Sequence, residues 1–205
     1  IIPKPNVSIP AIGVVCEGED FVIAASDIIT ADFNTLNWTS SNTLGTFIPN
    51  ALTGETIYRP AVNETGDVTL TLTATATDGA CADEIANLVL TINPSVIVEA
   101  GSGASICENE NYQIPDALIT NGDGVYNWSI LGPATFVPGT ENSMNPTIVP
   151  NTGASGIVTL TLVGNGSATC TNSAQDTVTI IINALPIVDA GAPVTACQGV
   201  TEIPL

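Results

Sequence analysis

Five cysteines are the residues of this chain whose spacing most restricts their chemistry. Cys16, Cys107 and Cys197 are 91 and 90 residues apart, and Cys81 and Cys170 are separated by 89 residues. No two of them have the Cys-x-x-Cys spacing that is typical of metal sites and redox motifs. The expected chemistry is therefore disulfide formation in an oxidising, extracytoplasmic environment.

Groups for acid–base and nucleophilic catalysis are scarce. The chain has no histidine, and Lys4 and Arg59 are its only basic residues against twenty carboxylates, which gives a net charge of −18. Most nucleophile–base pairs are unavailable with this composition, so we expect no enzyme. Nucleic acid and anionic lipid are not expected as partners either, because both bind clusters of Lys and Arg. No apolar run reaches the length of a membrane span.

Acidic residues are concentrated in the two turns that follow Cys16 and Cys107. They are Glu17, Glu19 and Asp20 after Cys16, and Glu108 and Glu110 after Cys107. Carboxylate oxygens are the ligands that Ca²⁺ prefers, so a calcium site at a joint between modules is one interpretation. A solvated acidic turn without metal is the interpretation we favour, since no Asp-x-Asp-x-Asp spacing is present. No other cofactor is expected.

The elements that position these side chains are predicted to be β-strands. In residues 66–77 the apolar Val68, Leu70, Leu72, Ala74 and Ala76 alternate with Thr, and residues 156–162 repeat the Val-Thr-Leu-Thr-Leu part of this pattern 90 residues later. A period of two places the apolar side chains on one face and the hydroxyls on the other. Trp38 and Trp128 are also 90 residues apart, and we expect both in the core.

The repeat period predicts the domain organisation. We expect one sandwich repeat in residues 1–93, a second in 94–183, and the first strand and turn of a third, incomplete repeat in 184–205. In the first copy the expected strands are residues 7–15, 21–25, 36–40, 45–48, 56–59, 68–77 and 85–92, with a hairpin turn at 78–79. Seven short strands per copy indicate an all-β chain of immunoglobulin-like β-sandwiches. The chain is expected to be a fragment of something longer.

Two disulfide patterns are compatible with these repeats. One places a bridge inside each sandwich, Cys16–Cys81 and Cys107–Cys170. However, the first turn and the last hairpin lie at opposite ends of such a sandwich, about 25 Å apart for a strand of eight residues, whereas bridged Cα atoms lie within about 7 Å. We favour the inter-domain bridge Cys16–Cys170, which leaves Cys81, Cys107 and Cys197 to pair with other modules.

The joints between the copies are short. Asn93-Pro94-Ser95 and Ala184-Leu185-Pro186 each contain a proline, and three residues of this kind do not form a flexible tether. The sandwiches are therefore expected to stack end to end as a semi-rigid rod. Each module adds roughly 35–40 Å of length at the rise of a β-strand.

Several motifs of this chain resemble one family of bacterial surface repeats. They are Ile187–Gly191 followed by Cys197, Ile106–Glu108, Cys16–Glu19, Trp38–Ser40 and the two Val-Thr-Leu-Thr-Leu strands. They resemble the repeats of SprB-type gliding-motility adhesins of Bacteroidetes, whose modules are called PKD-like or immunoglobulin-like. The resemblance implies a surface filament that is exported by type IX secretion and pulls on a substratum. It also implies that Thr177, in Asp176-Thr177-Val178, is a site for an O-glycan.

The expected function is structural. The Cys-to-Trp spacing is 22 residues in the first copy and 21 in the second, and such uniform loops favour the stalk of a long cell-surface adhesin. The expected partners are neighbouring repeats of the same chain and a polysaccharide or other substratum, at the bacterial cell surface. The alternative is a polysaccharide-binding module, with or without calcium, which would need one copy with an enlarged, aromatic-lined loop.

Overall fold

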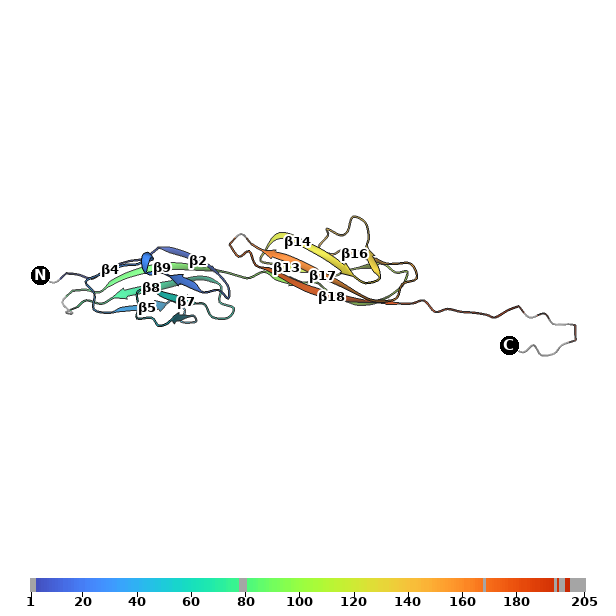
Figure 1. Cartoon of the computed structure of the whole chain (residues 1–205), viewed down its shortest axis with the longest axis horizontal. Helices are drawn as coiled ribbons and strands as arrows, with labels where there is room; N and C mark the ends of the chain where they lie inside the picture. The colour runs from blue at the N-terminus through green and yellow to red at the C-terminus, as the bar shows by residue number, and fades with distance from the viewer. Residues whose placement is uncertain (1–2, 78–80, 168, 194, 196–197, 200–205) are drawn as a thin grey trace.

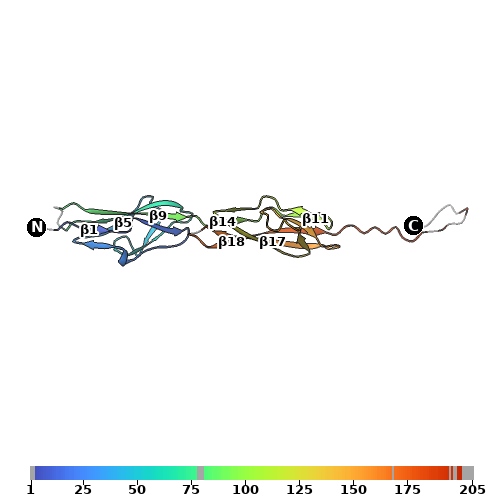
Figure 2. The same cartoon turned by 90° about the horizontal axis from the view of Figure 1, so that it is seen from above.

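The structure is a computed structural model that describes residues 3–77, 81–167, 169–193, 195 and 198–199. These residues form two immunoglobulin-like β-sandwiches that lie end to end along one axis (Figures 1 and 2). Each sandwich has its own hydrophobic core. The expected fold class, all-β with tandem immunoglobulin-like sandwiches, is therefore confirmed.

The first sandwich contains nine strands and one short 3₁₀ helix. They are β1 (Asn6–Ser8), β2 (Ile12–Cys16), β3 (Phe21–Ile23), η1 (Ala25–Asp27), β4 (Ile29–Ala31), β5 (Leu36–Ser40), β6 (Thr46–Ile48), β7 (Thr56–Arg59), β8 (Gly66–Ala74) and β9 (Glu84–Asn93). One sheet has the order β2-β9-β8-β5 and the other β3-β7-β6, while β1 pairs with β4. β2 runs parallel to β9, and the other pairs are antiparallel.

The second sandwich repeats this topology. Its strands are β10 (Ile97–Glu99), β11 (Ala104–Cys107), β12 (Tyr112–Gln113), β13 (Leu118–Thr120), β14 (Gly122–Leu131), β15 (Ala134–Phe136), β16 (Thr147–Pro150), β17 (Gly156–Gly166) and β18 (Ser173–Asn183). The sheets have the orders β11-β18-β17-β14 and β12-β16-β15, and β10 pairs with β13. β11 runs parallel to β18, as β2 does to β9.

The alternating strands form the centres of both cores. Val68, Leu70 and Leu72 of β8 are at most 1% exposed, and the threonines between them lie on the outer, partly exposed face of the sheet. In β17 the side chains at 158, 160 and 162 are equally buried. Each of these side chains contributes about 1.5–3 kcal/mol to folding through burial, so β8 and β17 anchor their sandwiches.

Two local predictions differ from the structure. The predicted first strand, residues 7–15, is divided at Pro10 into β1 and β2, which pair in different sheets, since proline cannot donate to a ladder. The expected strand 21–25 ends at Ile23, and η1 and β4 lie before residue 36, where no further strand was expected. Residues 184–193, at the start of the expected third copy, contain no strand. The predicted turn at 78–79 lies outside the described residues.

No helix in the described part of the chain is long and apolar enough to cross a membrane.

Candidate functional site

The joint between the two sandwiches is closed by a disulfide between Cys16 and Cys170, whose Cα atoms are 5.6 Å apart. Cys16 is the last residue of β2. Because β2 pairs in parallel with β9, Cys16 lies beside Asn93, the last residue of β9. Cys170 lies in the hairpin between β17 and β18, at the end of the second sandwich that faces the first. The bridge therefore connects two residues that are 154 positions apart in sequence.

The hairpin that carries Cys170 is held in a tight turn. The backbone N–H of Gly166 donates to the carbonyl of Asn172 (2.8 Å), and the N–H of Cys170 donates to the carbonyl of Ser167 (2.8 Å). A Cβ atom at position 166 would overlap the carbonyl oxygen of Cys170, so only glycine fits there. The glycine thus allows the close backbone approach that orients Cys170 towards the first sandwich.

Polar contacts across the joint supplement the disulfide. Asn93 Nδ2 donates to the hydroxyl of Thr169, at 2.6 Å. The backbone N–H of Ser95 donates to Glu17 Oε2 (3.0 Å), and the N–H of Glu17 donates to the carbonyl of Asn93 (2.8 Å). Asn121, from the second sandwich, donates through Nδ2 to the carbonyl of Ser95 (3.1 Å). Both sandwiches therefore bind the linker, and its backbone is fixed on two sides.

The bridge is enclosed by protein. Cys16 is 8% exposed and Cys170 is 1% exposed. A reductant or a competing thiol must reach a sulfur atom to open a disulfide, so burial on both sides slows exchange. The joint therefore has two protected covalent connections, the linker and the disulfide, and a hinge rotation about the linker alone is blocked.

The observed bridge, Cys16–Cys170, is the favoured inter-domain pair. The intra-domain alternative fails, because Cys16 and Cys170 are bonded to each other and neither Cys16–Cys81 nor Cys107–Cys170 is formed. Cys107 is half-buried and is the last residue of β11, a strand at the end of the second sandwich remote from the joint (Figure 2). Cys197 lies outside the described residues.

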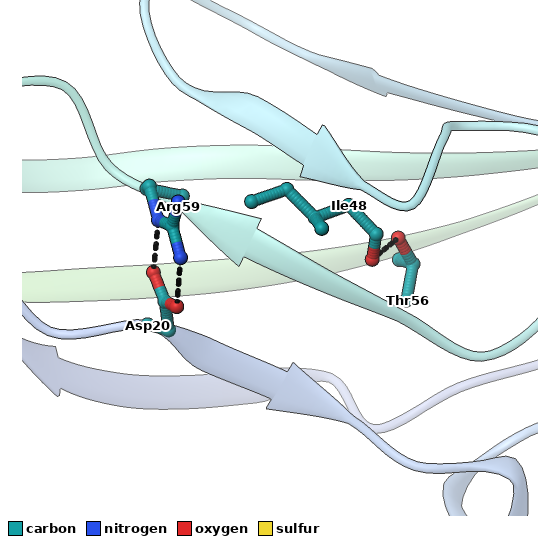
Figure 3. A network of polar contacts seen from close by, with 4 residues as sticks. All are labelled: Asp20, Ile48, Thr56 and Arg59. Atoms are coloured by element: carbon teal, nitrogen blue, oxygen red, sulfur yellow. Dashed lines mark hydrogen bonds and ion pairs between the residues drawn. The ribbon is translucent and has the colours of Figure 1, made fainter.

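Three of the five acidic residues considered as calcium ligands have separate partners. Asp20 accepts two hydrogen bonds from Arg59, from Nε at 2.7 Å and Nη2 at 2.6 Å (Figure 3). These bonds hold the pKa of the Asp20 carboxyl below its ordinary value of 3.8. Glu17 accepts from Ser95 in the linker, and Glu110 Oε2 accepts from the backbone N–H of Cys107 (3.0 Å).

Among the described residues, no group of three or more Asp, Glu, His or Cys side chains is placed to hold a metal ion. Glu19 is exposed, and Glu108 is half-buried in the turn after Cys107. Asp20, Glu17 and Glu110 thus bind Arg59 or backbone N–H groups rather than converging on one point.

The remaining predicted residues are structural or exposed. Trp38 and Trp128 are 2% and 5% exposed. Their indole N–H groups donate to backbone carbonyls, that of Trp38 to Thr53 and Gly54 at 3.1 Å each and that of Trp128 to Met144 at 3.2 Å. Thr177 is exposed on β18, on the outer face of its sheet.

One buried carboxylate was missed by the sequence analysis. Glu64 is 5% exposed and accepts hydrogen bonds from Tyr58 Oη (2.9 Å), Asn42 Nδ2 (2.6 Å) and the N–H of Ala61 (2.6 Å). Burial, and then the Glu64 carboxylate, raise the pKa of Tyr58 to about 12. The second copy has Ile148 and Ala154 at these two positions, so comparison of the repeats carried no signal for this pair.

Asn93 and Thr169 were also missed at the joint. Asn93 has a counterpart in Asn183, 90 residues later and likewise the last residue of a strand. That repetition is the signal that could have identified it. Thr169 has Ala80 as its counterpart, so no repeated residue pointed to it.

No model of a known protein family matches the chain, and no curated protein matches its sequence. Solved structures match over most of its length. Repeats EC22–24 of mouse cadherin-23 share 14% identity with a TM-score of 0.56, covering 90% of this chain and 67% of that one. Repeats EC1–2 of human mucin-like protocadherin share 12% identity with a TM-score of 0.47, covering 90% and 99%. The titin I-band fragment I67–I69 shares 11% identity with a TM-score of 0.44, covering 90% and 67%. At this level of identity, the likeness to the cadherin-23 repeats shows the tandem sandwich fold alone.

Proposed function

We propose that this chain is a load-bearing spacer in the stalk of a long extracellular adhesive filament. The observation that carries the proposal is the Cys16–Cys170 disulfide across the joint. A stalk must transmit tension and keep its length. A second covalent connection at the joint serves both requirements, because it holds the two sandwiches in line.

The bridge also decides which parts of the chain bear tension. A pull on the two ends follows the shortest covalent path, which runs along β1 and β2 to Cys16, across the disulfide to Cys170, and along β18 to the far end. The chain between the two cysteines, which contains most of both cores, lies in a closed covalent loop. Tension therefore bypasses β3 to β17, and these strands are not pulled apart by it.

We propose module boundaries at residues 1–93 and 94–183, with 184–205 as the beginning of a third module. The separate cores and the fixed linker at Asn93–Ser95 support the first boundary. Each complete module then contributes roughly 35–40 Å to the length of the stalk, as estimated from the rise per strand residue.

The more specific proposal is a gliding-motility adhesin at a bacterial cell surface, exported by type IX secretion, with Thr177 as an O-glycan acceptor. Its support is the resemblance of the cysteine turns and threonine strands to repeats of that family. Thr177 is exposed, so a glycan there would project from the rod without disturbing either core.

A polysaccharide-binding module is the weaker alternative. Sugar binding commonly uses exposed aromatic faces, but Tyr58 is fully buried, and Tyr112 and Tyr126 are half-buried with their hydroxyls donating to backbone carbonyls. A shallow hollow of about 230 Å³ is lined by aliphatic side chains with Glu55 and Thr56, and no aromatic ring lines it. These features favour a spacer over a sugar-binding site.

Adhesion under flow tests the proposed function. Source cells that carry the parent protein with Cys16→Ser and Cys170→Ser should attach normally at rest and detach at lower shear than wild-type cells. Antibodies raised against this chain should label intact cells. Unchanged resistance to shear in the double variant, or labelling only after permeabilisation, would contradict the proposal. Binding of the isolated chain to a polysaccharide array would favour the alternative.

A further inference from the structure

The far end of the second sandwich repeats the backbone arrangement of the joint. Cys107 ends β11 beside Asn183 in a parallel pair, as Cys16 ends β2 beside Asn93. The N–H of Glu108 donates to the carbonyl of Asn183 at 3.0 Å, which matches the 2.8 Å bond between Glu17 and Asn93 in the first copy. The cysteine, the asparagine and the backbone bond that the first sandwich contributes to the joint are thus present a second time.

The two copies differ in the asparagine that, in the first sandwich, contacts the hairpin carrying Cys170. Asn93 Nδ2 donates outward to Thr169 of the hairpin, whereas Asn183 Nδ2 donates back to Ser105 Oγ (2.7 Å) and the carbonyl of Ile106 (3.2 Å). Cys107 and Asn183 are also more exposed than Cys16 and Asn93. The greater exposure is expected of the same surface without a docked hairpin, and the bond to Ser105 uses a hydroxyl that the first copy lacks, since Val14 stands at that position.

We propose that this exit surface, formed by Cys107, Glu108 and Asn183, docks the last hairpin of a further sandwich module of the same type and forms a disulfide with it. The partner is defined by its chemistry: a β-hairpin with a cysteine at the position of Cys170 and a hydroxyl residue before it, as Thr169 is here. On docking, Asn183 turns from Ser105 to that hydroxyl. This proposal rests on the proposed stacking of modules in a stalk, because these three residues would join the second sandwich to the next module.

Bond formation is an oxidation of two thiols. Cys107 and the hairpin cysteine lose two protons and two electrons as the S–S bond forms. A small disulfide such as glutathione disulfide accepts them and leaves as two glutathione thiols. An oxidising extracellular environment supplies such oxidants.

The consequence is a set of overlapping covalent loops. The loop closed by Cys16 and Cys170 contains Cys107, so a second loop starting at Cys107 would begin inside the first and end in the next module. Residues 107–170 would then belong to both loops. Every joint would have its own bridge, and reduction of one bridge would leave the neighbouring joint closed.

A three-module chain tests the proposal. Residues 1–183 are followed directly by a second copy of 94–183, and the protein is oxidised with glutathione disulfide and then treated with iodoacetamide. We expect Cys107 of the middle module to escape alkylation and to appear, in a non-reduced digest, in one peptide pair with Cys170 of the added copy. Cys107 of the added copy faces no further module and should be fully alkylated, which makes it an internal control.

Two variants refine the test. Asn183→Ala in the middle module should lower the fraction bridged under a limiting thiol–disulfide buffer by about two- to tenfold, the effect of one net hydrogen bond. Cys107→Ser should abolish the new pair and leave Cys16–Cys170 intact. Alkylation of the middle Cys107, whether or not the added copy has folded, would overturn the proposal, as would its pairing with any cysteine other than the hairpin one.

A second measurement distinguishes failure of the exit-surface proposal from failure of the proposed spacer function. Small-angle X-ray scattering of the original chain reports whether the first joint is rigid and extended. An extended original chain together with an unbridged Cys107 would overturn only the exit-surface proposal. A compact or freely hinged original chain would contradict the spacer function itself.

Discussion

Stretching single molecules with and without the Cys16–Cys170 bridge tests the proposed load path directly. The perturbation is the double substitution Cys16→Ser and Cys170→Ser, or reduction of the wild-type chain. With the bridge intact, only the residues before Cys16 and after Cys170 can be straightened by a pull on the ends. Unfolding of either core inside the loop adds no length, because the loop is bypassed.

The magnitude follows from the 154-residue separation of the two cysteines. A fully extended chain spans at most about 3.3–3.6 Å per residue, so opening the bridge should release about 510–550 Å of additional contour length. The closed bridge contributes only the 5.6 Å between the Cα atoms to the same path. The predicted difference is therefore far larger than the folded length of either sandwich.

The assay is force–extension measurement by optical tweezers or atomic force microscopy, with handles attached at the two ends of the chain. The oxidised wild type should show short extensions, and the reduced protein and the double variant should show two large unfolding steps. Cys107→Ser is the matched control, since it removes a cysteine inside the loop and leaves the bridge in place. Equal total contour lengths for oxidised and reduced wild type would refute the load path.

Four further predictions concern single residues. Tyr58→Phe removes a hydrogen bond to the buried Glu64 carboxylate and should lower the free energy of unfolding of the first sandwich by about 1–3 kcal/mol in chemical denaturation. The pKa of Tyr58 is raised from 10.0 to about 12 in the folded state, so its contribution to stability should be complete below pH 10 and be lost as the pH rises through 12. Phenolate absorbance and thermal melting measure these two quantities. A Tyr58 titration near 10 in the folded protein would contradict this prediction. Gly166→Ala should displace the hairpin and lower the yield of the Cys16–Cys170 peptide pair in a non-reduced digest, and a wild-type yield would show that the close approach is unimportant. Arg59→Ala should return the pKa of Asp20 to about 3.8 by NMR titration, and the small stabilisation from this exposed pair, present above pH 3.8 and lost on acidification, should disappear with it.

The strand pattern could be predicted because it depends on local alternation. Residues 66–77 and 156–162 contain their own evidence for one buried and one hydroxyl-bearing face, and β8 and β17 bury the expected side chains. β5 and β7 match the predicted strands residue for residue. In contrast, β4 has only three residues with no clear alternation, and its pairing with β1 depends on a contact across the sandwich.

The burial of the Glu64 carboxylate could not be predicted from the sequence alone. Two of its donors, Ala61 and Tyr58, lie three and six residues before it, but the third, Asn42, is 22 positions away, and the second copy lacks the equivalent tyrosine and glutamate. A charged residue can be buried only where several donors converge. Whether the donors converge depends on how the strands pack, and no local sequence pattern predicts that packing.

The sequence by itself determined that the chain is a tandem array of β-sandwiches, because alternation and a 90-residue repeat are properties of the chain alone. It also indicated two competing disulfide pairings and favoured the one between the sandwiches, since the end of the sandwich at which each cysteine lies follows from strand order. Only the tertiary structure decided between these pairings. The parallel register of β2 with β9 brings Cys16 to the joint, and the tight turn at Gly166 directs Cys170 towards it. A disulfide forms only where two sulfur atoms meet, and that distance is set by packing between modules rather than by separation along the chain.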